Sequence, residues 1–370
     1  MSTGQERPAE GLFGRAVTGA RWNFAAQVVQ QVTRLGTVVV LGRLLTPGEF
    51  GLVTIATVVV GFAMLFNDLG TSAAVIQARE VAPPLLSTVF WTNVAFGMAL
   101  LLLTLASAPL VAHVYAEPRL IPILGALAFA FPLASVHAIQ KALLERNLVF
   151  NVTAMVETAA AVTGAAVAMA MAVAGLGVWA LVGQHLAGLG VMAALYWAKS
   201  PWRPTTEFAW EELRRVRHLS LHLVGFNVVN YLARNADYLL IGRVLGSTPL
   251  GLYTLAYRIM LQPLQSVSLV IGRVLFPAYS VIQDDDERLR RAYLRTVPLV
   301  ATVTLPILAG IGLVAGPFVR VAFGAQWEGA IPVLVILVPV GMFQSVATTV
   351  GPLYQAKGRT DLMFRWGLCA

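Results

Sequence analysis

The chain has 370 residues, of which 58% are hydrophobic and 12% are charged, and its mean hydropathy is +0.74. A soluble domain cannot bury that much apolar surface, so the composition excludes the soluble classes and indicates an all-α polytopic membrane protein. The formal net charge is +8, but the basic residues lie in short segments between apolar stretches, which is typical of topology determinants and argues against a nucleic-acid partner.

Apolar runs long enough to cross a bilayer predict ten membrane spans. They cover residues 21–43, 50–69, 85–109, 119–140, 150–174, 177–198, 219–245, 250–276, 297–317 and 330–356. A further run begins near Leu362 and stops at Ala370, which is too short to cross the membrane as a helix. We therefore expect either a C-terminally incomplete chain or a last segment that lies at the membrane surface.

Local signals mark where several spans begin or turn. Thr46-Pro47-Gly48-Glu49 predicts a capping box with proline at the first helical position. Ser247-Thr248-Pro249 is expected to do similar work at the start of the eighth span. Gly175-Leu176-Gly177 predicts a tight uncharged turn between the fifth and sixth spans.

The first span carries a polar stripe. Asn23, Gln27, Gln30 and Arg34 recur at spacings of four, three and four, which places them on one face of an α-helix. An arginine near the middle of a span is costly in lipid, so it normally faces a bundle interior or a water-filled cavity.

This stretch returns 200 residues later. Residues 21–56 and 221–256 share ten identities in 36 ungapped positions, including Arg34 with Arg234 and the Gly42-Arg43 pair with Gly242-Arg243. Hydrophobic composition alone would not align the glycines and the buried arginines. The repeat predicts two pseudo-symmetric six-helix lobes, the second apparently incomplete. We expect an N-terminal lobe at 1–198, a cytoplasmic linker at 199–218 and a C-terminal lobe at 219–370.

The loops predict the orientation. With the N-terminus inside, seventeen lysine and arginine residues fall on the cytoplasmic side and four on the other side: Arg43, Arg119, Arg243 and Arg320. The positive-inside rule therefore predicts a cytoplasmic N-terminus. Six spans separate the repeats, so both run the same way, with a pseudo-twofold axis along the membrane normal. Residues 210–217 of the linker are basic and amphipathic, which suits a helix on the inner leaflet.

Three segments resemble a known family. They are Arg43–Leu52 (RLLTPGEFGL), Asp68–Gln77 (DLGTSAAVIQ) and Gly175–Val182 (GLGVWALV). The chain is similar to the polysaccharide exporters, which include lipid-linked glycan flippases, of the multidrug/oligosaccharidyl-lipid/polysaccharide superfamily. The resemblance implies two six-helix lobes and alternating-access movement of polyprenyl-diphosphate-linked sugars from the cytoplasmic to the outer leaflet. It also implies a bacterial cytoplasmic membrane, with membrane lipids and other polysaccharide assembly proteins as further partners.

Arg34 and Arg234 are the leading candidates for substrate binding. Arginine holds phosphate oxygens with two bonds at once and stays charged, which suits the diphosphate of a lipid-linked glycan. The alternative is that each forms an internal ion pair, for Arg234 with Asp237 on the next turn. Arg258 could extend the same cationic cavity or reach the outer interface.

The remaining candidates are polar or acidic. Gln27, Gln30, Asn227 and Asn230 could bind sugar hydroxyls or join helices through hydrogen bonds. Asp68, Asp237 and Glu157 are candidates for coupling or gating, but Asp68 could instead cap a helix and Glu157 could make a hydrogen bond inside the bundle. His218 and His222 lack a third ligand nearby, so no metal is expected.

Three classes of function fit a polytopic membrane chain. No nucleophile elbow, nucleotide-binding loop or zinc signature is present in the sequence, and no cofactor is expected. A glycan polymerase would need a large extramembrane loop that the spacing of the spans does not provide. A drug or cation antiporter of the same fold should carry acids in its cavity, whereas the candidates here are mostly arginines. The sequence therefore favours a lipid-linked oligosaccharide flippase.

Overall fold

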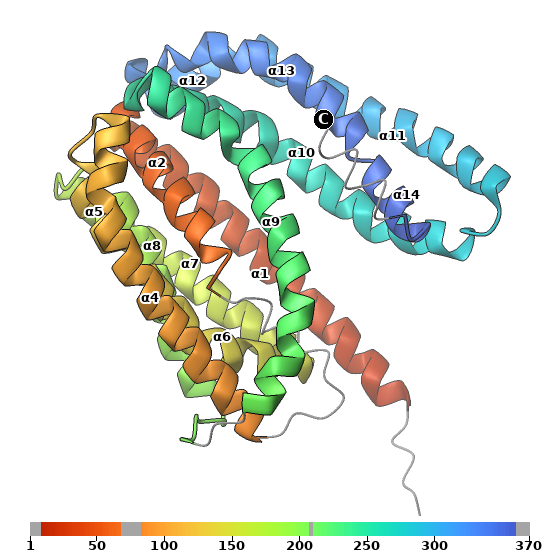
Figure 1. Ribbon diagram of the computed structural model, residues 1–370. Helices are drawn as coiled ribbons and strands as arrows, with labels where there is room; N and C mark the ends of the chain where they lie inside the picture. The colour runs from red at the N-terminus through yellow and green to blue at the C-terminus, as the bar shows by residue number, and fades with distance from the viewer. Residues whose placement is uncertain (1–8, 68–82, 207–209, 360–370) are drawn as a thin grey trace, which may run out of the picture. The chain divides into compact units, whose positions relative to one another are not determined.

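The structure is a computed structural model that describes residues 9–67, 83–206 and 210–359 (Figure 1). Side chains at 9–25, 83, 210–224, 226, 266–274 and 276–277 lie outside this description. All regular elements in the described part are helices. They are α1 (Ala9–Leu44), α2 (Pro47–Met64), α4 (Pro83–Tyr115), α5 (Leu120–Leu127), α6 (Ala130–Arg146), α7 (Phe150–Val173), α8 (Trp179–Lys199), α9 (Trp210–Val244), α10 (Ser247–Val281), α11 (Asp286–Leu313), α12 (Ala315–Phe323), the short 3₁₀ helix η1 (Ala325–Trp327), α13 (Ala330–Ala347) and α14 (Val350–Ala356).

The helices follow the predicted spans. Each of the ten predicted spans overlaps a helix, and seven helical segments of the described part are long and apolar enough to cross a membrane. Three predicted spans contain a helix break: the fourth consists of α5 and α6, the ninth crosses from α11 into α12, and the tenth consists of α13 and α14. The run predicted from Leu362, like Asp68, lies outside the described residues.

The longest helices exceed the hydrocarbon thickness. α1 has 36 residues, and α9 and α10 have 35 each. At ~1.5 Å of rise per residue each is about 50 Å long, whereas the hydrocarbon core is about 30 Å thick. Each of these helices therefore extends beyond the hydrocarbon core.

The chain divides into two compact units. The first comprises residues 1–45 and 55–235, and the second comprises residues 46–54 and 236–370. Two of the unit boundaries fall inside helices, within α2 and α9. The two lobes expected from the repeat stay a prediction.

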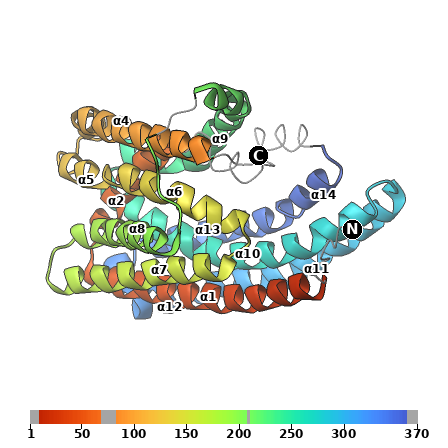
Figure 2. The ribbon, with the colours of Figure 1, turned by 90° about the horizontal axis from the view of Figure 1, so that it is seen from below.

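In the first unit α7 lies between α1 and α8 (Figure 2), while α4 packs on α5 and α6. The buried face of α7 consists mainly of small residues, such as Ala160, Gly164 and Ala168, which let membrane helices approach closely. At one end of the unit, an apolar cluster around Phe90 and Ile139 joins α4 to α6.

In the second unit α10 packs against α11, α13 and α14 (Figure 1). The start of α2 belongs to this unit, and there the hydroxyl of Thr254 donates to the hydroxyl of Thr54 at 3.3 Å. These two positions are 200 residues apart, so equivalent positions of the sequence repeat meet each other. This is the contact expected on a local twofold axis between the two segments.

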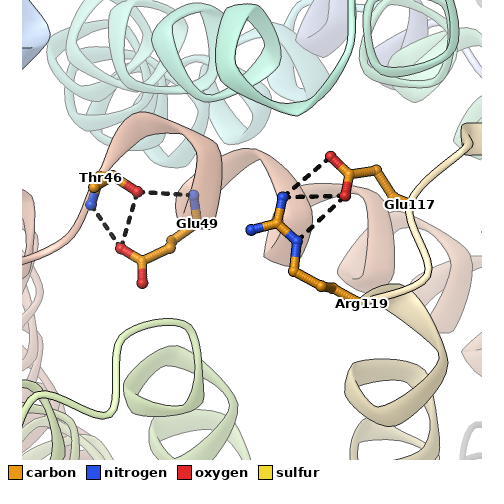
Figure 3. Close-up of polar contacts among 4 residues, drawn as sticks. All are labelled: Thr46, Glu49, Glu117 and Arg119. Atoms are coloured by element: carbon orange, nitrogen blue, oxygen red, sulfur yellow. Dashed lines mark hydrogen bonds and ion pairs between the residues drawn. The ribbon is translucent and has the colours of Figure 1, made fainter.

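The predicted capping box at Thr46 is confirmed (Figure 3). The backbone N–H of Thr46 donates to Glu49 Oε2 at 2.7 Å, and the Glu49 N–H donates to Thr46 Oγ1 at 3.4 Å. α2 begins at Pro47, as expected. The corresponding expectation for Ser247-Thr248-Pro249 is wrong: the N-cap of α10 is Gly246, at φ 92°, a residue without a side chain to cap the helix. Glycine fits there because a positive φ strains other residues, and the segment therefore turns through its backbone.

Two loops of the first unit have a defined local structure, one through its glycines and one through an ion pair. Gly175 and Gly177 both have positive φ, which confirms the tight turn between α7 and α8. Between α4 and α5, Arg119 Nη2 lies 3.1 Å from Glu117 Oε2 (Figure 3). The ion pair stays local to its own loop.

The segment after α8 is held against the first unit. Arg203 donates to the carbonyl oxygens of Ser200 (2.6 Å), Trp202 (2.8 Å) and Trp197 (2.9 Å), and its guanidinium carbon lies 5.3 Å from the ring centroid of Trp197. Trp91 Nε1 of α4 donates to the carbonyl of Thr205 at 2.9 Å. Residues 200–205, at the start of the predicted linker, are therefore attached to α4 and α8.

Candidate functional site

Arg34 lies on an exposed face of α1. Gln27, two turns earlier on the same face, is also exposed. Gln30 is half-buried, and its Nε2 donates to the hydroxyl of Thr158 on α7 at 3.1 Å. Of the two alternatives for Gln30, this contact favours a bond between helices. Among the described side chains of the polar stripe, Gln27 and Arg34 are the exposed ones.

Arg234 repeats this placement on α9. Its side chain is exposed, as is that of Asn230 one turn before it, whereas Asn227 is half-buried. The ion pairs found within the described ranges include neither Arg34 nor Arg234. The pairing of Arg234 with Asp237 that the sequence left open is therefore not among them. The guanidinium groups of Arg34 on α1 and Arg234 on α9 are therefore exposed and have no carboxylate partner in the described part of the chain.

Asp237 instead belongs to an aromatic cluster in the second unit. The hydroxyl of Tyr253 on α10 donates to Asp237 Oδ2 at 2.6 Å. Tyr253 and Tyr257 are stacked, with ring centroids 5.7 Å apart and an interplanar angle of 19°. Tyr238 of α9 meets both rings edge-on, at 5.7 and 6.0 Å. Arg258, the next residue on α10, is exposed and lies near enough to Tyr238 to act on it electrostatically.

Glu157 takes part in an ion pair inside the first unit. Lys141 Nζ of α6 lies 2.9 Å from Glu157 Oε1 of α7 and 3.8 Å from Glu145 Oε1. One turn before Lys141, the ring of His137 stacks on Tyr196 at 5.5 Å. The arrangement matches the alternative of a hydrogen bond inside the bundle, because the carboxylate already has a cationic partner.

Asp68 and the side chains of His218 and His222 lie outside the described residues. In the ranges that are described, no group of three histidine, cysteine, aspartate or glutamate side chains is arranged to hold a metal ion.

The tyrosine cluster was not predicted from the sequence. The spacing of Tyr253 and Tyr257 places them on one helix face, which was the available signal. The contact with Asp237 and Tyr238 depends on the register between α9 and α10, which periodicity does not report.

Comparisons with known proteins agree with the helical architecture. The family described as "Polysaccharide biosynthesis protein" matches residues 40–332. The chain is 30% identical over 363 residues to the lipopolysaccharide biosynthesis protein WzxC of Escherichia coli (strain K12), covering 96% of this chain and 73% of that protein. It is 29% identical over 333 residues to the succinoglycan biosynthesis transport protein ExoT of Rhizobium meliloti (strain 1021), covering 90% and 67%. A solved structure of lipid II flippase MurJ in an inward closed conformation has the same fold, with a TM-score of 0.72, 14% identity and coverage of 95% and 78%.

Proposed function

Because the chain belongs to the polysaccharide biosynthesis protein family, we propose that it flips a polyprenyl-diphosphate-linked oligosaccharide from the inner to the outer leaflet of the cytoplasmic membrane. The protein is a multi-pass membrane transporter of the multidrug/oligosaccharidyl-lipid/polysaccharide superfamily that serves polysaccharide biosynthesis, and it is not an enzyme. The identity of the cargo, its direction of movement and the residues that bind it are what we infer beyond this family membership.

The observation that carries the proposal is the placement of Arg34 and Arg234. Both are exposed on helices of a membrane protein, and neither has an ion-pair partner within the described residues. A guanidinium group on a hydrocarbon-facing surface is costly, so such groups normally face a cavity or a polar ligand. A diphosphate offers oxygens that the planar fork of arginine holds two at a time, so an anionic lipid headgroup satisfies both side chains.

The cargo passes by alternating access through a cationic cavity. Gln27 and Asn230 are exposed near the two arginines in sequence and supply amide groups for sugar hydroxyls. Outward movement of the negative diphosphate is favoured by a membrane potential that is positive outside, at about 2.3 kcal/mol per charge per 100 mV. Glu157 is not assigned a coupling role, because Lys141 already neutralises it.

The location and orientation of the protein are also inferred. The protein is placed in the bacterial cytoplasmic membrane with its N-terminus inside, on the positive-inside argument. Its other partners are the membrane lipids and proteins of polysaccharide assembly.

A transport assay tests the proposal. The protein is reconstituted into liposomes that contain a fluorescent polyprenyl-diphosphate glycan, and movement between leaflets is read by quenching of the accessible dye. The variants are Arg34→Ala, Arg234→Ala and the double substitution. Arg43→Ala and Arg243→Ala are the matched controls, because they are also repeat-related arginines but lie in the last turn of α1 and α9.

Transport by the wild type and by the controls, with loss in the double variant, is the expected result. Each single substitution should lower transport at least tenfold, since a lost charged hydrogen bond of about 1.5–3 kcal/mol corresponds to that or more. Unchanged transport in the double variant would assign the arginines a structural role. A folded wild type that moves no lipid-linked glycan, but expels an organic cation against a gradient, would replace the flippase with the antiporter.

A further inference from the structure

The tyrosine cluster of the second unit combines aromatic rings with one carboxylate. Tyr253 and Tyr257 are one turn apart on α10 and stacked, and Tyr238 of α9 packs edge-on against both. All three rings are half-buried rather than enclosed. Asp237 adjoins them through the Tyr253 hydroxyl. The cluster is therefore partly accessible and presents both apolar ring surface and polar atoms.

One atom of the cluster is unsatisfied. Asp237 Oδ2 accepts from Tyr253 at 2.6 Å, but Asp237 Oδ1 is buried and has no hydrogen-bond partner within the described ranges. Buried carboxylate oxygens almost always accept a hydrogen bond, because leaving one unmade costs free energy. An unsatisfied oxygen beside a partly exposed aromatic surface is therefore a place for a ligand that donates hydrogen bonds.

The first repeat has no counterpart of this cluster at the matching positions. The five positions of the first repeat that match Asp237, Tyr238, Tyr253, Tyr257 and Arg258 hold Thr37, Val38, Val53, Thr57 and Val58. The first repeat thus forms the corresponding helices, α1 and α2, with small and apolar residues at these places. A packing role alone does not explain why the second repeat carries three rings and two charges.

We propose that Tyr238, Tyr253, Tyr257 and Asp237 form a carbohydrate-binding subsite for the glycan of the transported lipid. The faces of sugar rings carry C–H groups with partial positive charge, which pack on the negative face of an aromatic ring. Sugar hydroxyls donate hydrogen bonds, which is what Asp237 Oδ1 lacks. The subsite rests on the proposed function for its ligand, and it separates recognition of the sugar from recognition of the diphosphate.

The charge next to the cluster selects between two ligand classes. Aromatic rings with a carboxylate also suit a quaternary ammonium ion. Arg258 lies near Tyr238, and its positive charge opposes a second cation there. A neutral or acidic sugar meets no such penalty, and an acidic sugar gains from Arg258.

Transport of two lipids tests the subsite. One is a fluorescent polyprenyl diphosphate that carries an oligosaccharide, and the other is the same polyprenyl diphosphate without sugar. The variants are Tyr238→Leu and Tyr257→Leu, with Tyr257→Phe to retain the ring. Val38→Leu is the matched control, since Val38 stands at the position of Tyr238 in the first repeat.

The leucine substitutions should affect transport of the glycosylated lipid and not transport of the bare lipid. Each leucine variant should raise the concentration of the glycosylated lipid needed for half-maximal transport by about tenfold, which is the effect of losing roughly 1.4 kcal/mol of binding. Transport of the bare lipid should not change, and Tyr257→Phe and Val38→Leu should behave as the wild type. Equal losses for both lipids would mean that the rings support the fold, and no loss for either would mean that they do not touch the sugar. Both outcomes overturn the subsite while leaving the flippase in place.

A binding measurement keeps the two proposals separate. Saturation-transfer NMR with neutral and uronate-containing oligosaccharides is recorded on the full chain in detergent, with and without Tyr238→Leu. Signal that the substitution removes supports the subsite even if the wild type moves no lipid. Absence of signal for the whole panel, or displacement of the sugar by tetramethylammonium, overturns it.

Discussion

Gly51 and Gly251 occupy reciprocal places in the second unit, each against the backbone that begins the other's helix. A Cβ added to Gly51 would lie 1.8 Å from the carbonyl oxygen of Ser247, and one added to Gly251 would lie 1.8 Å from that of Pro47. Because the atom in the way is backbone in both cases, a rotamer change cannot relieve the clash. The two helix starts can approach this closely only with glycine at both positions.

Gly51→Ala and Gly251→Ala should therefore each destabilise the protein by more than about 2 kcal/mol, since overpacking of a close contact costs on the order of 1–3 kcal/mol and here no side chain can yield. Gly310→Ala is the matched control, because nothing lies within 4 Å of its added Cβ on α11. Thermal unfolding of the three variants in detergent measures the difference. A melting temperature for Gly51→Ala equal to that of Gly310→Ala would contradict the close approach.

Thr46→Ala should lower stability by about 1 kcal/mol, the usual contribution of an N-cap side chain. Thr46 Oγ1 accepts the Glu49 N–H, and the substitution removes that acceptor. Thr46→Ser retains it and is expected to behave as the wild type. Hydrogen exchange of the first turn of α2 locates the effect, which should not reach α10, whose N-cap is Gly246.

The Lys141–Glu157 pair should contribute little to stability and nothing to proton coupling. Both side chains are about one-third exposed, at 37% and 32%, and pairs of that kind couple by roughly 0.2–1 kcal/mol. A double-mutant cycle with Lys141→Met and Glu157→Gln measures the coupling. Transport by Glu157→Gln should keep the pH profile of the wild type, and loss of pH dependence would instead identify Glu157 as the coupling carboxylate.

Arg203→Lys should loosen the segment that follows α8. The guanidinium group donates to three carbonyl oxygens at once, which an ammonium group on a differently shaped side chain cannot reproduce. We expect faster proteinase K cleavage within residues 200–206 and a loss of about 1–3 kcal/mol. Arg288→Lys, at an exposed position in the first turn of α11, is the control. Equal cleavage rates in the two variants would show that the three bonds do not hold the segment.

Long apolar runs and local signals made most of the fold predictable. The spans follow from hydropathy, the α2 cap from Thr46 and Glu49, and the α7–α8 turn from Gly175 and Gly177. The breaks between α5 and α6 and between α13 and α14 were missed, because both fall inside apolar runs without a charge to mark them. The start of α10 was assigned a side-chain cap because serine and threonine are good N-caps, but the positive φ of Gly246 turns the chain instead.

The candidate site was predictable only in part. Charged and amide residues inside spans can be found from the sequence, which is how Arg34 and Arg234 were singled out. Their partners depend on how neighbouring helices are set against each other. Gln30 with Thr158, Glu157 with Lys141 and Asp237 with Tyr253 each join different helices. No periodicity within one helix reports such a pair.

The meeting of Thr54 with Thr254 also bears on how such a chain could arise. A contact between equivalent positions is isologous, the kind that two identical subunits make across a twofold axis. Two copies of a single-repeat protein could therefore form the same helix crossing as a homodimer, in which one glycine of the sequence would occupy both sides of the contact. Fusion of two copies would turn that single requirement into two glycine positions, 51 and 251. At the crossing both glycines are retained, whereas a short distance along the same helices the second half carries tyrosines where the first half has valine and threonine.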